Sequence, residues 1–223
     1  MLFDSMTPDS FKARIDNYHK ECPQLKPVFV EPENGWRFAE IFRTEIIKRL
    51  NAKRVISTYL DNDDALNVRF VEDIQQRVAS MKDGTFINYD DGYQYYADDK
   101  FMMRVHYPTN LFISVVENSN AATVKGIFGY GGHAAIKKIE GAKIECVKNL
   151  RMWCEVVHEK NVMNDAKFLT VNMVKDENVL KREFAINDII EYGLGVYFCK
   201  FIPRYLKTFV WRTKYYIWLK MHH

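Results

Sequence analysis

Four consecutive residues carry the most distinctive chemistry in this sequence. Asp61-Asn62-Asp63-Asp64 places three carboxylates directly after the apolar, β-branched segment 54–60. Carboxylates crowded at the end of a buried strand repel one another and raise one another's pKa unless a cation lies between them. Mg²⁺ and Mn²⁺ prefer such oxygen ligands and commonly bridge them to the phosphates of a substrate. The run therefore predicts a site for a divalent metal and a diphosphate.

The acidic run also has two simpler interpretations. Such a short acidic pattern is most often a solvated turn, which here would cap the following helix. A calcium-binding loop that starts at Asp61 would place Asp63 and Glu72 at ligand positions. It would also place Ala65 and Leu66 where a ligand and the turn glycine belong, which excludes it. The position after an apolar strand favours the metal site over the solvated turn.

Elements on both sides of the acidic run determine how it is positioned. Apolar residues at helical spacing predict helices over 8–20 and 36–50, and a third helix that begins at Asn67. Short β-branched and aromatic segments predict strands at 26–30 and 54–60. Strands and helices that alternate in this way favour an α/β fold with a substantially parallel sheet. Ligands of such sheets bind beyond the carboxyl ends of the strands, where the acidic run lies.

The second half of the chain has sequence patterns typical of antiparallel strands, a glycine-rich loop and C-terminal helices. Between residues 84 and 118 we expect antiparallel hairpins, with Asp-Gly, Asp-Asp and Tyr-Pro-Thr-Asn turns. The expected strands are 85–89, 93–96, 101–105 and 112–116. A glycine-rich loop follows at 126–132, and helices are predicted from Ala185 to the end.

Length and composition favour one globular domain. The chain has 223 residues, of which 48% are hydrophobic and 27% charged, which excludes a disordered chain. It has no recognisable signal peptide and no apolar stretch of roughly 18 residues that would span a membrane. The widely spaced cysteines are expected as buried thiols in a reducing compartment, which predicts a cytoplasmic location. They are Cys22, Cys146, Cys154 and Cys199.

Other stretches accompany the acidic run. Ser57 to Leu66 is followed by Phe70-Val71-Glu72-Asp73-Ile74-Gln75, by Asn110-Leu111-Phe112-Ile113-Ser114 with Glu117, and by Met152-Trp153-Cys154-Glu155-Val156-Val157-His158-Glu159-Lys160-Asn161. Together they resemble the putative rhamnosyltransferase family of bacterial glycosyltransferases, over about residues 1 to 190. The acidic motif combined with Trp153, His158 and Asn161 is more specific than the acidic motif alone.

The resemblance implies a GT-A-like, Rossmann-like mixed sheet flanked by helices, with Mg²⁺ or Mn²⁺ as cofactor. It implies transfer of a sugar, rhamnose by the family name, from a nucleotide-sugar donor to a saccharide or lipid-linked saccharide acceptor of the cell envelope. The implied metal ligands are Asp61, Asp63 or Asp64, and His158. The implied donor-binding residues are Asp61, Asn62, Asp63, His133 and Asn161. A lone histidine on an apolar segment is otherwise most often a hydrogen-bonded core residue.

Candidate binding and catalytic residues also lie outside the acidic run, and their roles have alternative interpretations. His133 follows Gly131-Gly132 in a loop expected to fold over the sugar or the acceptor, and a plain hairpin loop is the alternative. An inverting transferase also needs a carboxylate that removes the proton of the acceptor hydroxyl. Glu117, at the end of an apolar strand, is the candidate base, with Asp165 as the second choice. Asp64 is the other candidate catalytic residue.

The start of the chain departs from that family's pattern. Such enzymes usually begin with a strand and a helix that hold the nucleotide base, whereas here Met1-Leu2-Phe3-Asp4 resembles the end of a second strand. We therefore expect a glycosyltransferase domain over 1–190 that lacks its first β-α unit. The alternative function is a catalytically impaired homologue that acts as a binding or membrane-associated module.

Residues 191–223 form a basic, aromatic tail. After Glu191 there is no acidic residue, whereas six cations follow. They are Lys200, Arg204, Lys207, Arg212, Lys214 and Lys220. We expect either a helix that lies on an anionic lipid surface, on the inner face of the cell membrane, or a helix that packs on the domain. Nucleic acid is not an expected partner, because the rest of the chain shows no basic stripe.

Overall fold

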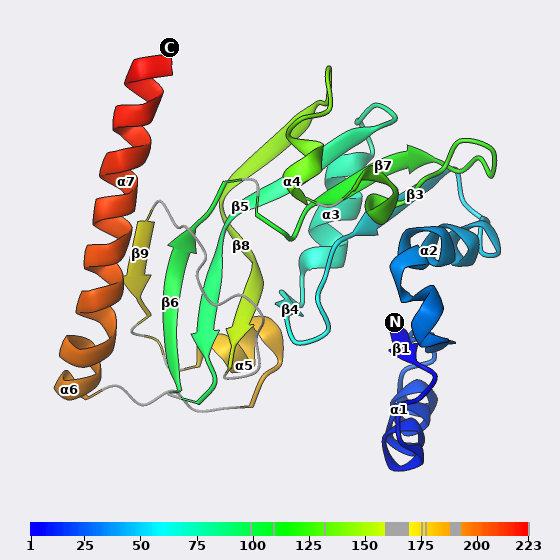
Figure 1. The fold of residues 1–223 in the computed structure, drawn as a ribbon, viewed down its shortest axis with the longest axis horizontal. Helices are drawn as coiled ribbons and strands as arrows, with labels where there is room; N and C mark the ends of the chain where they lie inside the picture. Colours follow the sequence, from blue (N-terminus) through cyan, green and yellow to red (C-terminus); the bar gives the residue numbers. More distant parts are fainter. Residues whose placement is uncertain are drawn as a thin grey trace.

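The computed structural model describes residues 1–98, 100–108, 110–131, 133–158, 170–174, 176, 178–187 and 193–222 (Figure 1). Its strands are β1 (Leu2–Asp4), β2 (Val28–Val30), β3 (Arg54–Thr58), β4 (Ala65–Leu66), β5 (Thr85–Tyr96), β6 (Phe101–His106), β7 (Ser114–Asn118), β8 (Ile144–Val157) and β9 (Thr170–Met173). Its helical segments are α1 (Asp9–Glu21), η1 (Pro32–Arg37), α2 (Phe38–Ile47), α3 (Phe70–Val78), η2 (Ile127–Tyr130), α4 (His133–Ile136), α5 (Val179–Phe184), α6 (Leu194–Val196), η3 (Tyr197–Phe201) and α7 (Ile202–His222).

The main sheet is mixed, and most of its strand pairs are antiparallel. The strand order is β3-β7-β5-β6-β9, with β8 beside β5 and β4 beside β8. Within this sheet β5 and β8 are parallel, whereas the other strand pairs among the described residues are antiparallel. The prediction of a substantially parallel sheet is therefore wrong, although the mixed sheet flanked by helices is confirmed. Short connections such as 97–100 between β5 and β6 allow only antiparallel neighbours, because a parallel pair needs a long crossover.

Strands β3, β5 and β8 share one direction in the main sheet but end at different levels. Both β3 and β5 are antiparallel to β7, so they run in the same direction, and β8 is parallel to β5. Strand β3 ends at Thr58, level with Ile87 of β5, whereas β8 ends beside Tyr96, the last residue of β5. The segment after β3 continues to the end of β8, where Asp63 meets His158. A ligand of an α/β sheet is expected to bind beyond the carboxyl ends of such strands.

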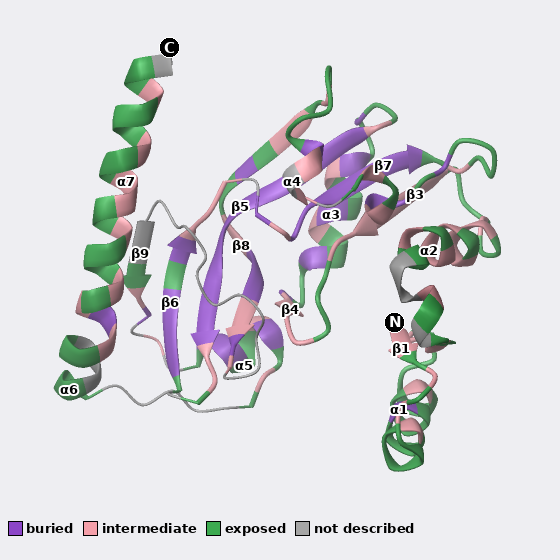
Figure 2. Cartoon of the chain, in the orientation of Figure 1, coloured by how far each residue is buried: buried purple, intermediate pink, exposed green. Residues whose placement is uncertain are grey.

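The main core cluster joins α3 to residues of β5, β6, β7 and β8 and extends to Phe201 before α7, and the buried residues lie mostly in the central strands (Figure 2). The apolar face of α3 buries Phe70, Ile74 and Val78, which recur at the predicted helical spacing. Trp153 of β8 is almost fully buried and stacks on Phe112, with ring centroids 4.7 Å apart. The strand before His158 is therefore part of the core, and Ile56 of β3, the strand before the acidic run, packs against it.

Strand β5 continues through the Asp-Gly pair that was predicted to be a hairpin turn. Gly92 lies inside β5, and a Cβ atom there would be 2.2 Å from the ring of Trp153. Glycine is therefore required by close packing and not by a turn. The expected break between strands 85–89 and 93–96 is wrong.

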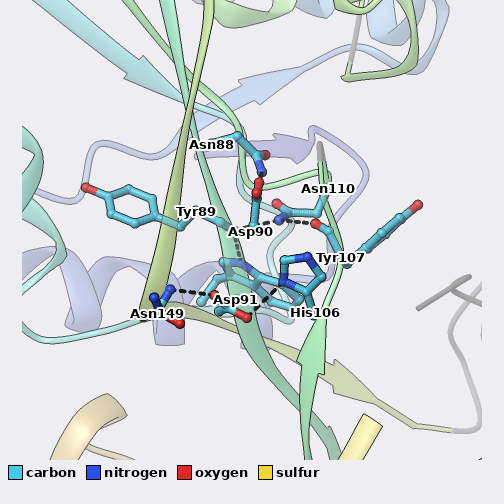
Figure 3. Close-up of polar contacts among 9 residues, drawn as sticks. Asn88, Tyr89, Asp90, Asp91, His106, Tyr107, Asn110 and Asn149 are labelled. Carbon is cyan, nitrogen blue, oxygen red and sulfur yellow. Dashed lines mark hydrogen bonds and ion pairs between the residues drawn. The ribbon is translucent and has the colours of Figure 1, made fainter. Parts of the chain in front are cut away.

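The acidic residues within β5 are satisfied by polar partners in the sheet (Figure 3). The Asn149 N–H donates to Asp91 Oδ2 at 2.6 Å, and His106 Nδ1 lies 3.0 Å from Asp91 Oδ1. Asn88 Nδ2 donates to Asp90 Oδ1 at 2.8 Å. These contacts explain how a strand holds adjacent carboxylates in a buried position, since buried polar groups need hydrogen-bond partners.

Replacing Gly92 with Ala is expected to lower the free energy of unfolding by about 3 kcal/mol, because the added methyl group overlaps the Trp153 ring. Urea unfolding measures the loss. Gly193→Ala is the matched control, since a Cβ atom there meets nothing within 4 Å. Equal stability of the two variants would contradict the packing argument.

The N-terminal elements form a separate layer of structure. Strands β1 and β2 pair in parallel as their own small sheet, as the resemblance of residues 1–4 to a strand end suggested. The predicted helices over 8–20 and 36–50 are found as α1 and as η1 with α2. The predicted third helix begins at Phe70, after Asn67.

The cysteines are free, but most of them are not buried. Cys154 is buried in β8, whereas Cys22, Cys146 and Cys199 are exposed. The prediction of buried thiols therefore holds for Cys154 alone. Among the described residues, no helix combines the length and the hydrophobicity needed to span a membrane.

Candidate functional site

The acidic turn is fixed between β3 and β8. The Asp64 N–H donates to the Asp61 carbonyl at 3.3 Å, which closes the turn after β3. Asp64 Oδ1 accepts the Val156 N–H of β8 at 2.9 Å. Strand β4, which follows at once, pairs with Trp153 and Cys154 of β8. These backbone contacts hold the turn against the end of β8.

The turn meets the histidine that follows β8. His158 Nε2 lies 3.2 Å from Asp63 Oδ2, and both side chains are about one-third exposed. The structure thus brings together two residues that the sequence assigned to one metal site. Their contact joins the carboxyl ends of β3 and β8 and leaves both side chains accessible to a ligand.

Burial and mutual repulsion raise the pKa values of Asp61 and Asp64 in the turn. Burial is the main reason that the pKa of Asp64 rises to about 8, despite the Val156 N–H, and nearby Glu155 adds to the rise. Burial and then Asp63 raise the pKa of Asp61. The crowding that the sequence suggested is therefore present, and a cation would relieve it.

Glu155 is a further carboxylate of this site. It lies on β8 beside Gln94 of β5, whose Nε2 donates to Glu155 Oε2 at 3.0 Å. Burial raises the pKa of Glu155 to about 7, and the charges of Asp63 and Asp61 raise it further. The sequence held one signal for this residue, a lone charge inside the apolar run 152–157. No role was predicted for it.

The donor atoms of this site fit Mg²⁺ or Mn²⁺. Carboxylate oxygens suit either ion. Asp61 and Asp63 would supply such oxygens and His158 an additional nitrogen, and burial together with the charge of Asp63 raises the pKa of Asp61. Within the described ranges, no three His, Cys, Asp or Glu side chains already converge as a metal centre. The residues therefore provide the ligand types, and Asp63 and His158 already lie 3.2 Å apart.

His133 lies near the acidic turn but not in a loop. It is the first residue of the short helix α4, so the expected flexible loop at this position is wrong. Its ring centroid is 6.5 Å from that of Tyr59, which follows β3. Burial and then Lys137 lower the pKa of His133, whereas Asp61 opposes the shift. His133 is thus close enough to the acidic turn to interact with the charge of Asp61.

Three of the other predicted donor-binding and base residues give less information. Asn62 is exposed at the tip of the turn. Asn161, and Asp165 as the second candidate base, lie outside the described residues, so their predicted roles stay predictions.

Glu117 lies away from the acidic turn. It pairs with Val55, near the start of β3, whereas the turn follows the end of β3. Its buried carboxylate accepts the Lys125 and Gly126 N–H groups at 2.9 and 2.8 Å, and the Tyr130 hydroxyl at 3.1 Å. These contacts anchor the loop before α4. They favour a structural role over the predicted role as catalytic base, which stays a prediction.

Replacing Glu117 with Gln is expected to lower the free energy of unfolding by about 1–3 kcal/mol, because the new amide group faces N–H donors. Sugar transfer is expected to persist. Urea unfolding and a transfer assay measure the two effects, with exposed Glu140→Gln as the control. Unchanged stability with abolished transfer would instead assign Glu117 as the base.

The residues of this site lie within the range that a known protein family model matches. The family model described as Putative rhamnosyl transferase matches residues 1–168, a range that includes the acidic turn, Glu155 and His158. No curated protein and no solved structure matches the chain. Because the family model covers well over half of the sequence, the chain belongs to the putative rhamnosyl transferase family.

Proposed function

We propose that the chain is a metal-dependent glycosyltransferase. In this proposal it moves a sugar from a nucleotide-sugar donor to a saccharide or lipid-linked saccharide acceptor of the cell envelope. The observation that carries the proposal is the contact between Asp63 and His158, which joins the acidic turn to the end of β8. Membership of the family supports sugar transfer and makes nucleotide-linked rhamnose the first donor to test.

The acidic turn is proposed as the donor diphosphate site. Asp61, Asp63 and His158 would hold Mg²⁺ or Mn²⁺, which supplies Lewis-acid stabilisation of the departing diphosphate when bound. Asp64 is proposed to fix the position of the turn, because its carboxylate accepts the Val156 N–H and β4, which follows it, pairs with β8. Asn62, at the exposed tip, is placed to contact the donor.

Glu155 is proposed as the group that accepts the proton of the acceptor hydroxyl. Gln94 holds one carboxylate oxygen of Glu155, which restrains the side chain, and the charges of Asp63 and Asp61 act on this carboxylate. In a direct displacement, the acceptor oxygen bonds to the sugar carbon as the bond from that carbon to the diphosphate breaks. The hydroxyl proton passes to Glu155, and this use of a positioned carboxylate is general base catalysis.

A transfer assay tests the proposed function. The full chain is incubated with Mn²⁺, a panel of nucleotide sugars and oligosaccharide acceptors, and both nucleoside diphosphate and glycosylated product are measured. We expect one donor to be consumed, with product formed in equal amount, and we expect a chelator to stop the reaction. Turnover that is unaffected by the chelator would refute the metal site. A lack of turnover with every donor would favour a non-catalytic binding module.

A further inference from the structure

Helix α7 presents an apolar face that no described element covers. The helix runs beside β9 at the edge of the main sheet and extends away from it toward the C-terminus (Figure 1). Its start is held by buried Phe201 and by Arg204, whose guanidinium lies 3.9 Å from the ring centroid of Tyr96. The helix lies outside residues 1–168, which the family model matches.

The two sides of α7 differ in exposure (Figure 2). Residues four and seven apart lie on one side of a helix. One such series is half-buried, and Arg204 at its start contacts Tyr96 of the domain, whereas Trp218 on the same side is exposed. The half-buried series is Arg204, Thr208, Trp211, Tyr215 and Leu219. The opposite side, called here the outer face, is 44% to 68% exposed at each of its large residues. They are Tyr205, Leu206, Phe209, Val210, Tyr216, Ile217 and Met221. Helix packing on the domain therefore explains only one side of α7.

The charges around the outer face indicate what covers it. Helix α7 contains five cations and no acidic residue. They are Arg204, Lys207, Arg212, Lys214 and Lys220. A second copy of the chain would bring the same cations against each other, and like charges at close range are unfavourable. Nucleic acid would match the cations but would leave aliphatic side chains such as Leu206 and Ile217 without a partner. An anionic lipid surface accommodates both groups, with cations at headgroups and apolar side chains below them.

We propose that the outer face of α7 docks on an anionic lipid bilayer and lies in the plane of its surface. Lys207 and Lys214, which are exposed on one flank, would contact lipid phosphates and carboxylates. Phe209 and Ile217 would enter the boundary between headgroups and acyl chains. Such docking would bring the domain to acceptors that are carried on lipids. The inference stands apart from the proposed transfer chemistry, because vesicle binding requires neither donor nor metal.

Vesicle flotation with the full chain tests this proposal. We expect binding to vesicles that contain phosphatidylserine and phosphatidylcholine, and at least about tenfold weaker binding to phosphatidylcholine alone. Added salt should weaken the binding, because it screens the cations. Phe209→Glu with Ile217→Glu should reduce the binding at least about tenfold, since both changes place an acid on the outer face.

The control variant adds two acidic residues to surfaces of the protein other than α7. Phe11→Glu with Val71→Glu changes two exposed apolar residues on α1 and α3 and should leave vesicle binding unchanged. Circular dichroism and urea unfolding should show that all variants are folded. Equal binding by the outer-face variant and the wild type would overturn the proposal, as would equal binding to neutral vesicles. It would also be overturned by a dimer in sedimentation that the outer-face substitutions dissociate, or by RNA binding without vesicle binding.

Discussion

Replacing Asp63 with Asn is expected to reduce sugar transfer by at least about 100-fold, with the fold intact. The substitution keeps the shape of the side chain but removes the charge that pairs with His158. The side chain is about one-third exposed, so its loss should change stability little. Donor turnover at saturating substrate measures the effect, and the affinity for Mn²⁺ should fall in parallel.

The control for this prediction is Asp16→Asn. Asp16 is an exposed carboxylate on α1, so the variant loses the same charge at a position away from the acidic turn. It should retain wild-type turnover. If Asp63→Asn also retains wild-type turnover, Asp63 is not a ligand and the assignment of the site to this turn fails.

Replacing Glu155 with Gln is expected to reduce turnover by about 100-fold to 10,000-fold, because the side chain can no longer accept a proton. Binding of the donor should be retained, since Asp61, Asp63 and His158 are unchanged. The measurement is turnover together with the affinity for the nucleotide sugar. A loss of donor affinity without a loss of maximal turnover would instead assign Glu155 to donor binding.

Stability as a function of pH gives a second test of Glu155. Without metal, its folded pKa of about 7 is raised above the ordinary value. The stability that the protonated form contributes is therefore present below the ordinary pKa and is lost as the pH rises through about 7. Glu155→Gln should remove this part of the pH dependence, whereas Glu145→Gln at the other end of β8 should not. Identical pH profiles for wild type and Glu155→Gln would contradict the buried-carboxylate assignment.

The acidic turn and its strand were predictable because their signals are local. Segment 54–60 is apolar and the carboxylates follow at once, so strand β3 and the turn after it could be expected from neighbouring residues. The pairing of Asp63 with His158 could be expected only through the family resemblance. No periodicity within either segment indicates that the ends of β3 and β8 meet.

Other features could not be predicted because they depend on distant partners. Gly92 has the sequence signature of a turn, yet Trp153 on another strand is what requires a glycine there. Glu155 becomes part of the site only because β4 pairs with β8 and brings the acidic turn beside it. Glu117 follows an apolar strand as Asp61 does, but β7 runs opposite to β3 and places it at the other end. Strand direction, which the sequence does not show, separates these two carboxylates.

Calorimetric titration of the full chain with a nucleoside diphosphate, with and without Mn²⁺, tests the central claim most directly. The account predicts binding only when Mn²⁺ is present, and a Mn²⁺-dependent gain in stability of about 2.7 kcal/mol at a ligand concentration of 100 times Kd. It also predicts that Asp63→Asn abolishes both effects. Binding of equal strength without a divalent cation, or binding that Asp63→Asn leaves unchanged, would contradict a metal-bridged diphosphate at the acidic turn.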